Sequence, residues 1–364
     1  MILGGRRRER PDTHWLVLSD GARPTEDIYF YESAATAMHH QGVRTERFPV
    51  SRAFGAAWLH GRSFMRNYAG ANLLLCRSLP LSWLRCLERN RNAFGYIVYL
   101  VDDDISAAAT DNMLPGSYRK RMARIASLQP RLLALADEVV VCSDQLARYF
   151  TPRHPNVSVL TPPLLAPLPG LEHFAGSPSA QLPWQIGFHG TRAHLQDLLH
   201  IMPALEALQQ QRDDTQLEVM LGQHIPKRLA ALPRVRAPAP LPWEAFKQYQ
   251  RQHRFHIGLA PLLETPFNQG KSFIKFLDIA AMGGVGLYSN RYPYTEVVRH
   301  GENGLLVEDS LTAWCDSLQQ LLDNPIATAR MAQQAAVDAQ LIGDPLKTEA
   351  FWMSRSRSVD GAFE

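Results

Sequence analysis

The sequence predicts an α/β protein with two doubly wound, Rossmann-like domains whose parallel sheets face a central cleft. Three observations predict this fold class. The chain has 364 residues, which favours two domains because single domains average roughly 100–200 residues. Short apolar runs alternate with longer amphipathic stretches, and a proline-rich segment divides the runs into two series. Such alternation is typical of parallel sheets with right-handed crossovers.

The apolar runs are rich in Val, Ile and Leu, and their hydrophobicity is continuous, which indicates strands buried on both faces. In the first half we expect strands at His14–Ser19, Asn72–Cys76, Tyr96–Val101, Glu138–Cys142 and Val157–Leu160. In the second half we expect them at Trp184–Phe188, Leu217–Leu221, His256–Leu259, Val285–Ser289 and Leu305–Val307. Helical spacing is clearest in one set of residues: Leu195, Leu198, Leu199, Met202, Leu205 and Leu208.

The segment Thr161–Gly170 separates the two series. Its proline density cannot continue a helix or a central strand, so we interpret it as an interdomain linker. The predicted domains are residues 1–166 and 167–342. Because doubly wound domains bind ligands beyond the carboxyl ends of their strands, we expect the chemistry just after each apolar run.

Composition excludes several protein classes. Hydrophobic residues make up 46% and charged residues 20%, and the net charge of +3 is too small to indicate a nucleic-acid partner. Part of that charge is the N-terminal cluster Arg6, Arg7, Arg8 and Arg10. Two interpretations stay open for it: a solvated arm, or peripheral contact with anionic lipid at a membrane.

The cellular setting follows from what the chain lacks. Its cysteines, Cys76, Cys86, Cys142 and Cys315, have no paired spacing, which favours free thiols in a reducing compartment. The longest apolar run, near Tyr96–Val101, is far shorter than the ~18 residues of a membrane span. A secretory signal requires an apolar core after its N-terminal charges, and this sequence has none there. We therefore expect a cytoplasmic protein.

The turn Gly270-Lys271-Ser272 lies between a buried strand and the helical run Phe273–Met282. A helix start here offers free N–H groups, a helix dipole and an ammonium to one point, which predicts a phosphate site. A P-loop would need glycine five positions before Gly270, where Thr265 stands. The alternative to a phosphate contact is a solvated surface lysine.

Asp278 follows on the same helix, among apolar residues, and an acid in such surroundings needs a partner. A ribose diol would supply two hydroxyl donors. The alternative is an ordinary structural hydrogen bond or an exposed acid. Gly283-Gly284 then ends the predicted helix.

Another candidate turn follows the first strand of the second domain. At Gly190-Thr191 the backbone can approach a diphosphate closely, and Arg192 can pair with its oxygens. Glycine there for turn geometry alone is the competing interpretation. His189 is either a cleft residue or a packed turn histidine.

In the first domain, three acids, Asp102, Asp103 and Asp104, end a predicted strand. Their mutual repulsion argues against a purely structural role without nearby cations or helix N-termini. One interpretation is a divalent cation held on a diphosphate. The other is helix N-capping together with acceptor contact in the cleft. Arg77, which ends the preceding strand, can meet either these acids or the acceptor.

These motifs resemble, in order and spacing, those of retaining GT-B glycosyltransferases of the family-4 or group 1 type. The resemblance is densest over residues 256–325, and its matching positions are Pro261-Leu262-Leu263, Phe267-Asn268, Lys271-Ser272, Lys275, Leu277-Asp278, Ala280-Ala281, Gly283, Ser289, Glu296-Val297-Val298 and Gly301–Val307. It implies the GT-B fold and sugar transfer from a UDP-, GDP- or dTDP-sugar to an acceptor hydroxyl. It also implies retention, glycan or polysaccharide biosynthesis, a glycan or lipid-linked acceptor, no required cofactor and no essential metal, which favours the second interpretation of the three acids.

The resemblance assigns roles to individual residues. Asp278 stands where the family has a ribose-binding Glu, whereas Gly270 stands where it often has a sugar-contacting Glu, so Lys271 or Glu264 is expected to serve instead. The expected catalytic residues are Lys271, Arg192 and His189. Lys271, the helix start at Ser272 and Arg192 would stabilise the leaving diphosphate. The expected donor-binding residues are Gly190, Thr191, Glu264, Asn268, Gly270, Ser272, Asp278 and Glu296. Residues 343–364, with Phe351 and Trp352, are expected to return to the first domain.

Two rival functions remain for the same fold. A nucleotide-sugar 2-epimerase would use cleft acids and histidines near the donor sugar, for which Asp102–Asp104 and His189 are candidates. A non-catalytic nucleotide-sugar binding module is suggested by the missing acid at Gly270.

Overall fold

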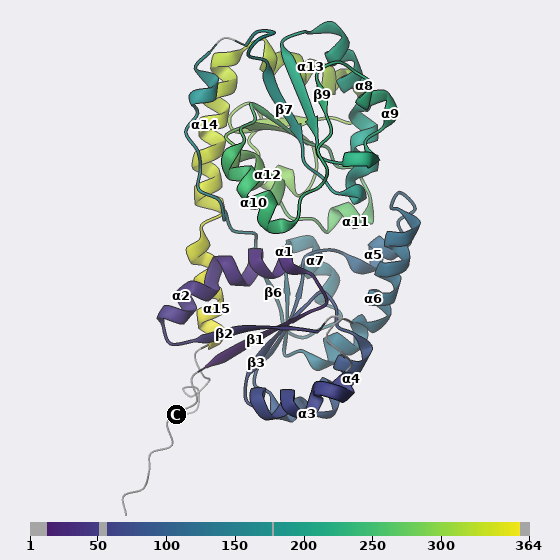
Figure 1. The fold of residues 1–364 in the computed structure, drawn as a ribbon, viewed down its shortest axis with the longest axis vertical. Coiled ribbons are helices and arrows are strands. Elements are labelled where there is room, and N and C mark those ends of the chain that lie inside the picture. The colour runs from purple at the N-terminus through teal and green to yellow at the C-terminus, as the bar shows by residue number, and fades with distance from the viewer. Residues whose placement is uncertain (1–12, 51–56, 177, 357–364) are drawn as a thin grey trace, which may run out of the picture.

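The architecture consists of two parallel six-stranded sheets stacked end to end (Figure 1). A computed structural model describes residues 13–50, 57–176 and 178–356. The strand orders are β2-β1-β3-β4-β5-β6 and β12-β11-β10-β7-β8-β9. The predicted fold class is therefore confirmed.

The first sheet contains β1 (His14–Ser19), β2 (Arg44–Pro49), β3 (Asn72–Cys76), β4 (Ile97–Val101), β5 (Glu138–Val141) and β6 (Val157–Val159). Its connections are α1 (Arg23–Glu26), the π-helix η1 (Asp27–Ala35), α2 (Thr36–His40), α3 (Ala57–Tyr68), α4 (Leu81–Arg89), η3 (Arg91–Ala93), α5 (Ile105–Thr110), α6 (Gly116–Leu135) and α7 (Asp144–Phe150). The central strand β4 is buried along its whole length, as its continuous apolar run predicts.

The second sheet contains β7 (Trp184–Phe188), β8 (Thr215–Val219), β9 (Val235–Arg236), β10 (Ile257–Ala260), β11 (Val285–Ser289) and β12 (Gly304–Val307). Its helices are α8 (Leu195–Gln211), α9 (Lys227–Ala230), α10 (Trp243–Gln252), α11 (Pro266–Gln269), α12 (Ile274–Ala281), α13 (Leu311–Leu322) and α14 (Pro325–Ile342). Short 3-10 turns are η4 (Glu172–Phe174), η5 (Arg192–His194), η6 (Gly222–His224) and η7 (Tyr294–Glu296).

The predicted strands are confirmed, with ends displaced by at most two residues. Two strands that the sequence does not predict, β2 and β9, both lie at a sheet edge. Their residues are half-buried or exposed, so no continuous apolar run marks them. The predicted helix at Leu195 is α8, and Gly283 follows α12 with a φ of 76°, a conformation that glycine adopts without strain.

The chain crosses between the two sheets twice, at Thr161–Gly170 and between α14 and α15 (Pro345–Ser356). The crossings touch where the Leu164 N–H donates to the Gly343 carbonyl at 2.7 Å. Helix α15 then packs on the first sheet's core, and the Trp352 indole N–H donates to the Tyr29 carbonyl at 2.6 Å. We propose to keep the domain division at residues 166 and 342, with the last segment joined to the first domain.

Within the described ranges, no helix combines the length and the apolar character that a membrane span needs. The cluster Arg6–Arg10 lies outside the described residues.

Candidate active site

A cavity of about 340 Å³ lies between the two domains, where the loops after the strands of both sheets meet. The first domain contributes Pro24, Ile28 and Glu32 to its wall, and the linker contributes Pro163–Ala166. The second domain contributes His189, Gly190, Thr191, His194, Met220, Pro240, Leu241, Trp243, Phe246, Lys247, Gln250, Arg251, Ile274, Lys275, Leu277, Asp278 and Ala281. The predicted Gly190-Thr191 turn and Asp278 thus line one cavity.

The start of α12 forms one side of this cavity. In the described part of the chain, nothing accepts a hydrogen bond from the backbone N–H groups of residues 272–275, as expected for the first turn of a helix. Lys275 Nζ lies 3.1 Å from an Asp278 carboxylate oxygen. The other oxygen of Asp278 accepts from the Gln250 amide at 3.2 Å. Asp278 therefore has two protein partners and still faces the cavity.

His189 is held in place from behind. Its Nε2–H donates to the Glu218 carboxylate at 2.9 Å, and the same oxygen accepts from the Tyr249 hydroxyl at 2.5 Å. Burial lowers the pKa of His189 below its ordinary value, and this effect outweighs the Glu218 carboxylate, which acts in the opposite direction. The neutral imidazole therefore keeps its proton on Nε2, and Nδ1 is left as an acceptor.

The turn after His189 is shaped by packing and capping. A Cβ at Gly190 would lie 2.9 Å from the Phe188 ring, so this position has little room for a side chain. The Thr191 hydroxyl accepts from the Ala193 N–H at 3.4 Å and caps η5. Arg192 is exposed and has no ion pair with any described residue. Its guanidinium is therefore available to a ligand.

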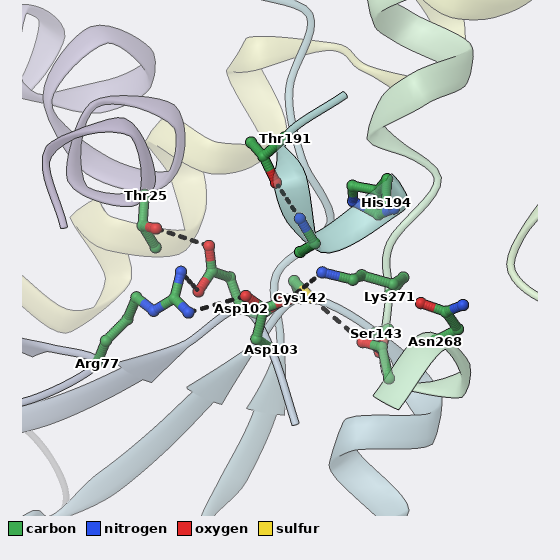
Figure 2. A network of polar contacts seen from close by, with 12 residues as sticks. Thr25, Arg77, Asp102, Asp103, Cys142, Ser143, Thr191, His194, Asn268 and Lys271 are labelled. Carbon is green, nitrogen blue, oxygen red and sulfur yellow. Dashed lines mark hydrogen bonds and ion pairs between the residues drawn. The ribbon is translucent and has the colours of Figure 1, made fainter. Parts of the chain in front are cut away.

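Lys271 contacts the first domain (Figure 2). Its Nζ lies 2.6 Å from an Asp103 oxygen, and the other Asp103 oxygen accepts from the Arg77 guanidinium at 2.8 Å. Lys271 Nζ also lies 4.1 Å from the centre of the Phe267 ring. Burial acts to raise the pKa of Asp103, but Lys271 and Arg77 outweigh it and hold that pKa at about 2. Lys271, the predicted phosphate-binding residue, is thus paired with the Asp103 carboxylate in this structure.

The two neighbouring acids have different partners: Asp102 shares Arg77 with Asp103, whereas Asp104 caps a helix. Asp102 accepts from the Thr25 hydroxyl at 2.6 Å and lies 3.3 Å from the Arg77 guanidinium. Burial raises the pKa of Asp102 despite the effect of Arg77. Asp104 accepts from the Ala107 N–H at 2.8 Å and caps α5, and burial raises its pKa. Asp104 is therefore a helix N-cap, which is one part of the interpretation that assigned the three acids to helix capping and acceptor contact.

Gly270 lies at the contact between the domains. Its carbonyl accepts from the Ser143 hydroxyl at 3.0 Å. A Cβ at this position would lie 3.1 Å from the Asp104 Cβ and 3.2 Å from a Leu146 methyl. A side chain at position 270 would therefore crowd the first domain, and its neighbours would have to shift by a few tenths of an ångström.

Five predicted donor residues do not line the cavity: Gly270, described above, and Glu264, Asn268, Ser272 and Glu296. Glu264 and Glu296 are exposed. Asn268 is buried, and its amide donates to the Asp197 carboxylate and the Leu263 carbonyl at 3.1 and 3.0 Å. The loop before Gly270 is therefore fastened to the start of α8. Ser272 is half-buried and lies near the Tyr29 hydroxyl.

The two domains are joined at two places beside the cavity. The inner bridge consists of the Lys271–Asp103 ion pair and the Ser143–Gly270 hydrogen bond. The outer bridge joins η1 and α1 to α10 and consists of the ion pairs Arg23–Glu244, at 3.0 Å, and Lys247–Glu32. Both bridges pair residues far apart in the sequence.

The described residues contain one group of acids close enough to share a cation: Asp27, Glu32 and Glu244. Each already has a cationic partner, Arg47 for Asp27, Lys247 for Glu32 and Arg23 for Glu244. Asp102, Asp103 and Asp104 do not form such a group within the described ranges.

Several residues beside the cavity escape sequence reasoning. Ser143 lies two residues after the end of β5, so the rule of carboxyl strand ends could have found it. Lys275 lies within the resembling motif but was given no role of its own. For Glu218 and Tyr249 the sequence offers no signal, because a mid-strand acid and a helical tyrosine are ordinary surface residues.

A comparison with protein-family models finds no match, and a comparison with curated proteins finds none either. Among solved structures, the chain is similar to sucrose-phosphate synthase from Thermosynechococcus elongatus, with 13% identity and a TM-score of 0.66 over 96% of this chain and 100% of that one. It is similar to Anabaena HepE, solved with UDP and glucose, with 14% identity and a TM-score of 0.59 over 94% and 99% of the two chains. A glycosyltransferase from Rickettsia africae matches with 10% identity and a TM-score of 0.59 over 97% and 100%. At these identities the likeness establishes the fold, and the chain has the GT-B fold that these proteins share.

Proposed function

We propose that the protein is a glycosyltransferase that moves a sugar from a nucleotide diphosphate sugar to an acceptor hydroxyl, with retention. The observation that carries the proposal is the interdomain cavity, whose wall combines the Gly190-Thr191 turn, Asp278 and Lys275. A turn without side-chain bulk, free helix amides and a cation form a site for a diphosphate. A carboxylate one turn further along α12 suits a ribose diol.

The chemistry requires stabilisation of the leaving group. Breaking the bond between sugar and diphosphate builds negative charge on the phosphate oxygens, which preorganised cations and N–H groups stabilise. The unbonded amides of residues 272–275 and Lys275 supply these groups from α12. We assign Lys271 a shared role, in which Asp103 holds its ammonium at the edge of the cleft until the diphosphate competes for it.

The remaining roles follow from position. His189 presents Nδ1 as a hydrogen-bond acceptor, which suits a ligand hydroxyl, and Arg192 is available to a phosphate. Asp102, Asp103 and Arg77 lie on the first domain's side, where an acceptor would enter. We propose a glycan or lipid-linked acceptor, a role in polysaccharide biosynthesis in the cytoplasm, no essential metal and no nucleic-acid partner. UDP is the first nucleotide to test, since HepE was also solved with UDP-glucose.

The decisive experiment measures nucleotide binding and release. The protein is incubated with UDP-glucose, GDP-mannose and dTDP-glucose, with and without a panel of glycan and lipid-linked acceptors. We expect one donor to bind and its nucleotide to be released faster when an acceptor is present. Absence of binding to all three nucleotides would refute the proposal. Conversion of the sugar without an acceptor would indicate an epimerase, and binding without release would indicate a binding module.

A variant separates the phosphate site from the nucleoside site. Lys275→Ala should weaken the binding of UDP roughly tenfold or more, because a hydrogen bond to a charged group is lost, while the binding of uridine should change little. Lys227→Ala, on an exposed helix outside the cavity, is the matched control. Equal losses for UDP and uridine would contradict the phosphate role of Lys275.

A further inference from the structure

The helices on one face of the first sheet are strongly basic. Right-handed crossovers from β2 to β3, β3 to β4 and β4 to β5 place α3, α4 and α6 on the same face. The net charges of α3, α4 and α6 are +2, +1 and +5, which together give +8. The whole chain carries only +3, so all other residues together have a net charge of −5.

The opposite face of the same sheet lacks this charge. It is covered by α1, η1, α2 and α15, since α15 packs on η1 and the connection from β1 to β2 runs in the other direction. These four elements carry a net charge of −1. Basicity is therefore a property of one face and not of the domain as a whole.

Seven exposed cations lie on the basic face, and six of them form pairs one helical turn apart. The exposed residues are Arg62 and Arg66 on α3, Arg85 and Arg89 on α4, and Lys120, Arg121 and Arg124 on α6. In the described part of the chain, none of them lies within ion-pair distance of a carboxylate. The one acid on these helices, Glu88, is paired with Arg131. This face thus presents a set of cations without counter-charges.

Two exposed apolar side chains lie at the cleft end of this face. Leu81 is the first residue of α4 and is 39% exposed, and Met113, in the loop between α5 and α6, is 45% exposed. Both follow the carboxyl ends of the neighbouring strands β3 and β4. A soluble polyanion has no apolar region that can bury these side chains, whereas the boundary between lipid headgroups and acyl chains can bury them. Cations beside exposed apolar residues therefore favour a lipid partner.

We propose that the outer face of α3, α4 and α6, with Leu81 and Met113 at its edge, docks on an anionic membrane surface. The attraction comes from unpaired Lys and Arg side chains near anionic headgroups, and the apolar pair sets the edge that faces the bilayer. Because that edge is the one that carries Asp102–Asp104, docking brings the mouth of the cleft to the membrane. The proposal does not depend on the proposed reaction.

The test is co-sedimentation of the full chain with vesicles of phosphatidylglycerol or of phosphatidylcholine. We expect binding to phosphatidylglycerol only, and release by salt. The paired changes Arg85→Glu with Arg89→Glu, and Lys120→Glu with Arg124→Glu, should each weaken that binding at least about tenfold, given the contribution of each cation near the surface. The control, Lys227→Glu with Arg330→Glu, makes the same change of charge on exposed helices of the second domain and should bind as the original protein does.

A second variant distinguishes lipid from a soluble polyanion. Leu81→Ser with Met113→Ser should weaken binding to phosphatidylglycerol vesicles and leave binding to dextran sulfate unchanged. Binding of dextran sulfate as tight as that of vesicles, without any effect of this variant, would assign the face to a soluble polyanion and overturn the proposal. Equal losses for the basic-face variants and their control would overturn it as well. Circular dichroism and thermal unfolding of each variant verify that it is folded.

Discussion

The inner and outer bridges join the same two domains with the same kinds of ions, yet their surroundings differ. In the inner bridge, the Asp103 and Lys271 side chains are 11% and 19% exposed. In the outer bridge, Arg23 and Glu244 are 56% and 55% exposed, whereas Lys247 and Glu32 are 15% and 29% exposed, so only the Arg23–Glu244 pair lies in water. Charges in water interact weakly and are screened by salt, whereas buried charges are screened much less.

This difference indicates what each bridge can do. A buried ion pair is weak evidence of net stability, but the loss of one partner is costly, because the other charge is left without compensation. The contact between the two domains at the inner bridge therefore depends on an intact Lys271–Asp103 pair. The exposed Arg23–Glu244 pair of the outer bridge can form and break with little change in free energy, which suits the entrance to a substrate cavity.

The largest expected effect is that of Asp103→Ala. It leaves Lys271 buried without its carboxylate and removes one partner of Arg77, so the free energy of unfolding should fall by about 3 kcal/mol. Urea unfolding followed by tryptophan fluorescence measures this change.

The matched control replaces both charges, in the double variant Asp103→Asn with Lys271→Met. It should lose clearly less stability than Asp103→Ala, because no unpaired charge remains. If the double variant is as unstable as Asp103→Ala, the loss of stability comes from the loss of the ion pair and not from an unpaired Lys271.

Acid should weaken the inner bridge in a defined pH range. The pKa of Asp103 is about 2 in the folded protein, against an ordinary value of 3.8. A carboxyl whose folded pKa is lowered contributes stability above its unfolded pKa and loses it as the pH falls through the folded pKa. Between pH 4 and pH 2 the original protein should therefore lose roughly 2 kcal/mol more than Asp103→Asn. Urea unfolding across this range measures both. The raised pKa of Asp102 acts in the opposite direction, and because the Asp103 carboxylate is one of its causes, this effect is smaller in Asp103→Asn. Parallel stability curves would contradict the role of Asp103.

Ser143→Ala tests the uncharged part of the inner bridge. The Ser143 hydroxyl donates to the Gly270 carbonyl and accepts from the Leu146 N–H, which caps α7. Its loss should cost about 1–2 kcal/mol. Ser310→Ala removes a cap of the same kind on α13 without an interdomain bond. The difference between the two variants measures the interdomain bond, and equal losses would show that Ser143 matters only as a cap.

The contrast between the bridges also shows how far sequence reasoning reaches. The fold was predictable because buried parallel strands such as β4 form continuous apolar runs. The edge strands β2 and β9 were missed because edge residues are half-exposed and leave no such run. Asp278 and the Gly190-Thr191 turn were predicted at the cavity because a motif and the rule of carboxyl strand ends both point there.

The bridges themselves could not be predicted from local patterns. Lys271 and Asp103 were each singled out, but for separate sites, because nothing in the sequence states that two strand ends from different domains meet. The outer bridge and the Glu218–His189 contact join ordinary surface residue types at long sequence separation. The packing of the two domains against each other determines the two bridges, and the pairing of β7 with β8 determines the Glu218–His189 contact.

The smallest expected effect is that of Arg23→Ala in the outer bridge. Both partners of this pair are largely exposed, so the urea midpoint should change less than it does for Ser143→Ala. Raising the salt from about 0.1 M to about 1 M shortens the screening length from roughly 10 Å to roughly 3 Å, so the remaining difference from the original protein should vanish. The effect of Asp103→Ala should persist at the same salt concentration, because burial and not solvent sets the strength of that pair. If Arg23→Ala costs as much as Asp103→Ala, or if salt leaves its effect unchanged, the Arg23–Glu244 pair is not the weak, screened contact that its exposure predicts.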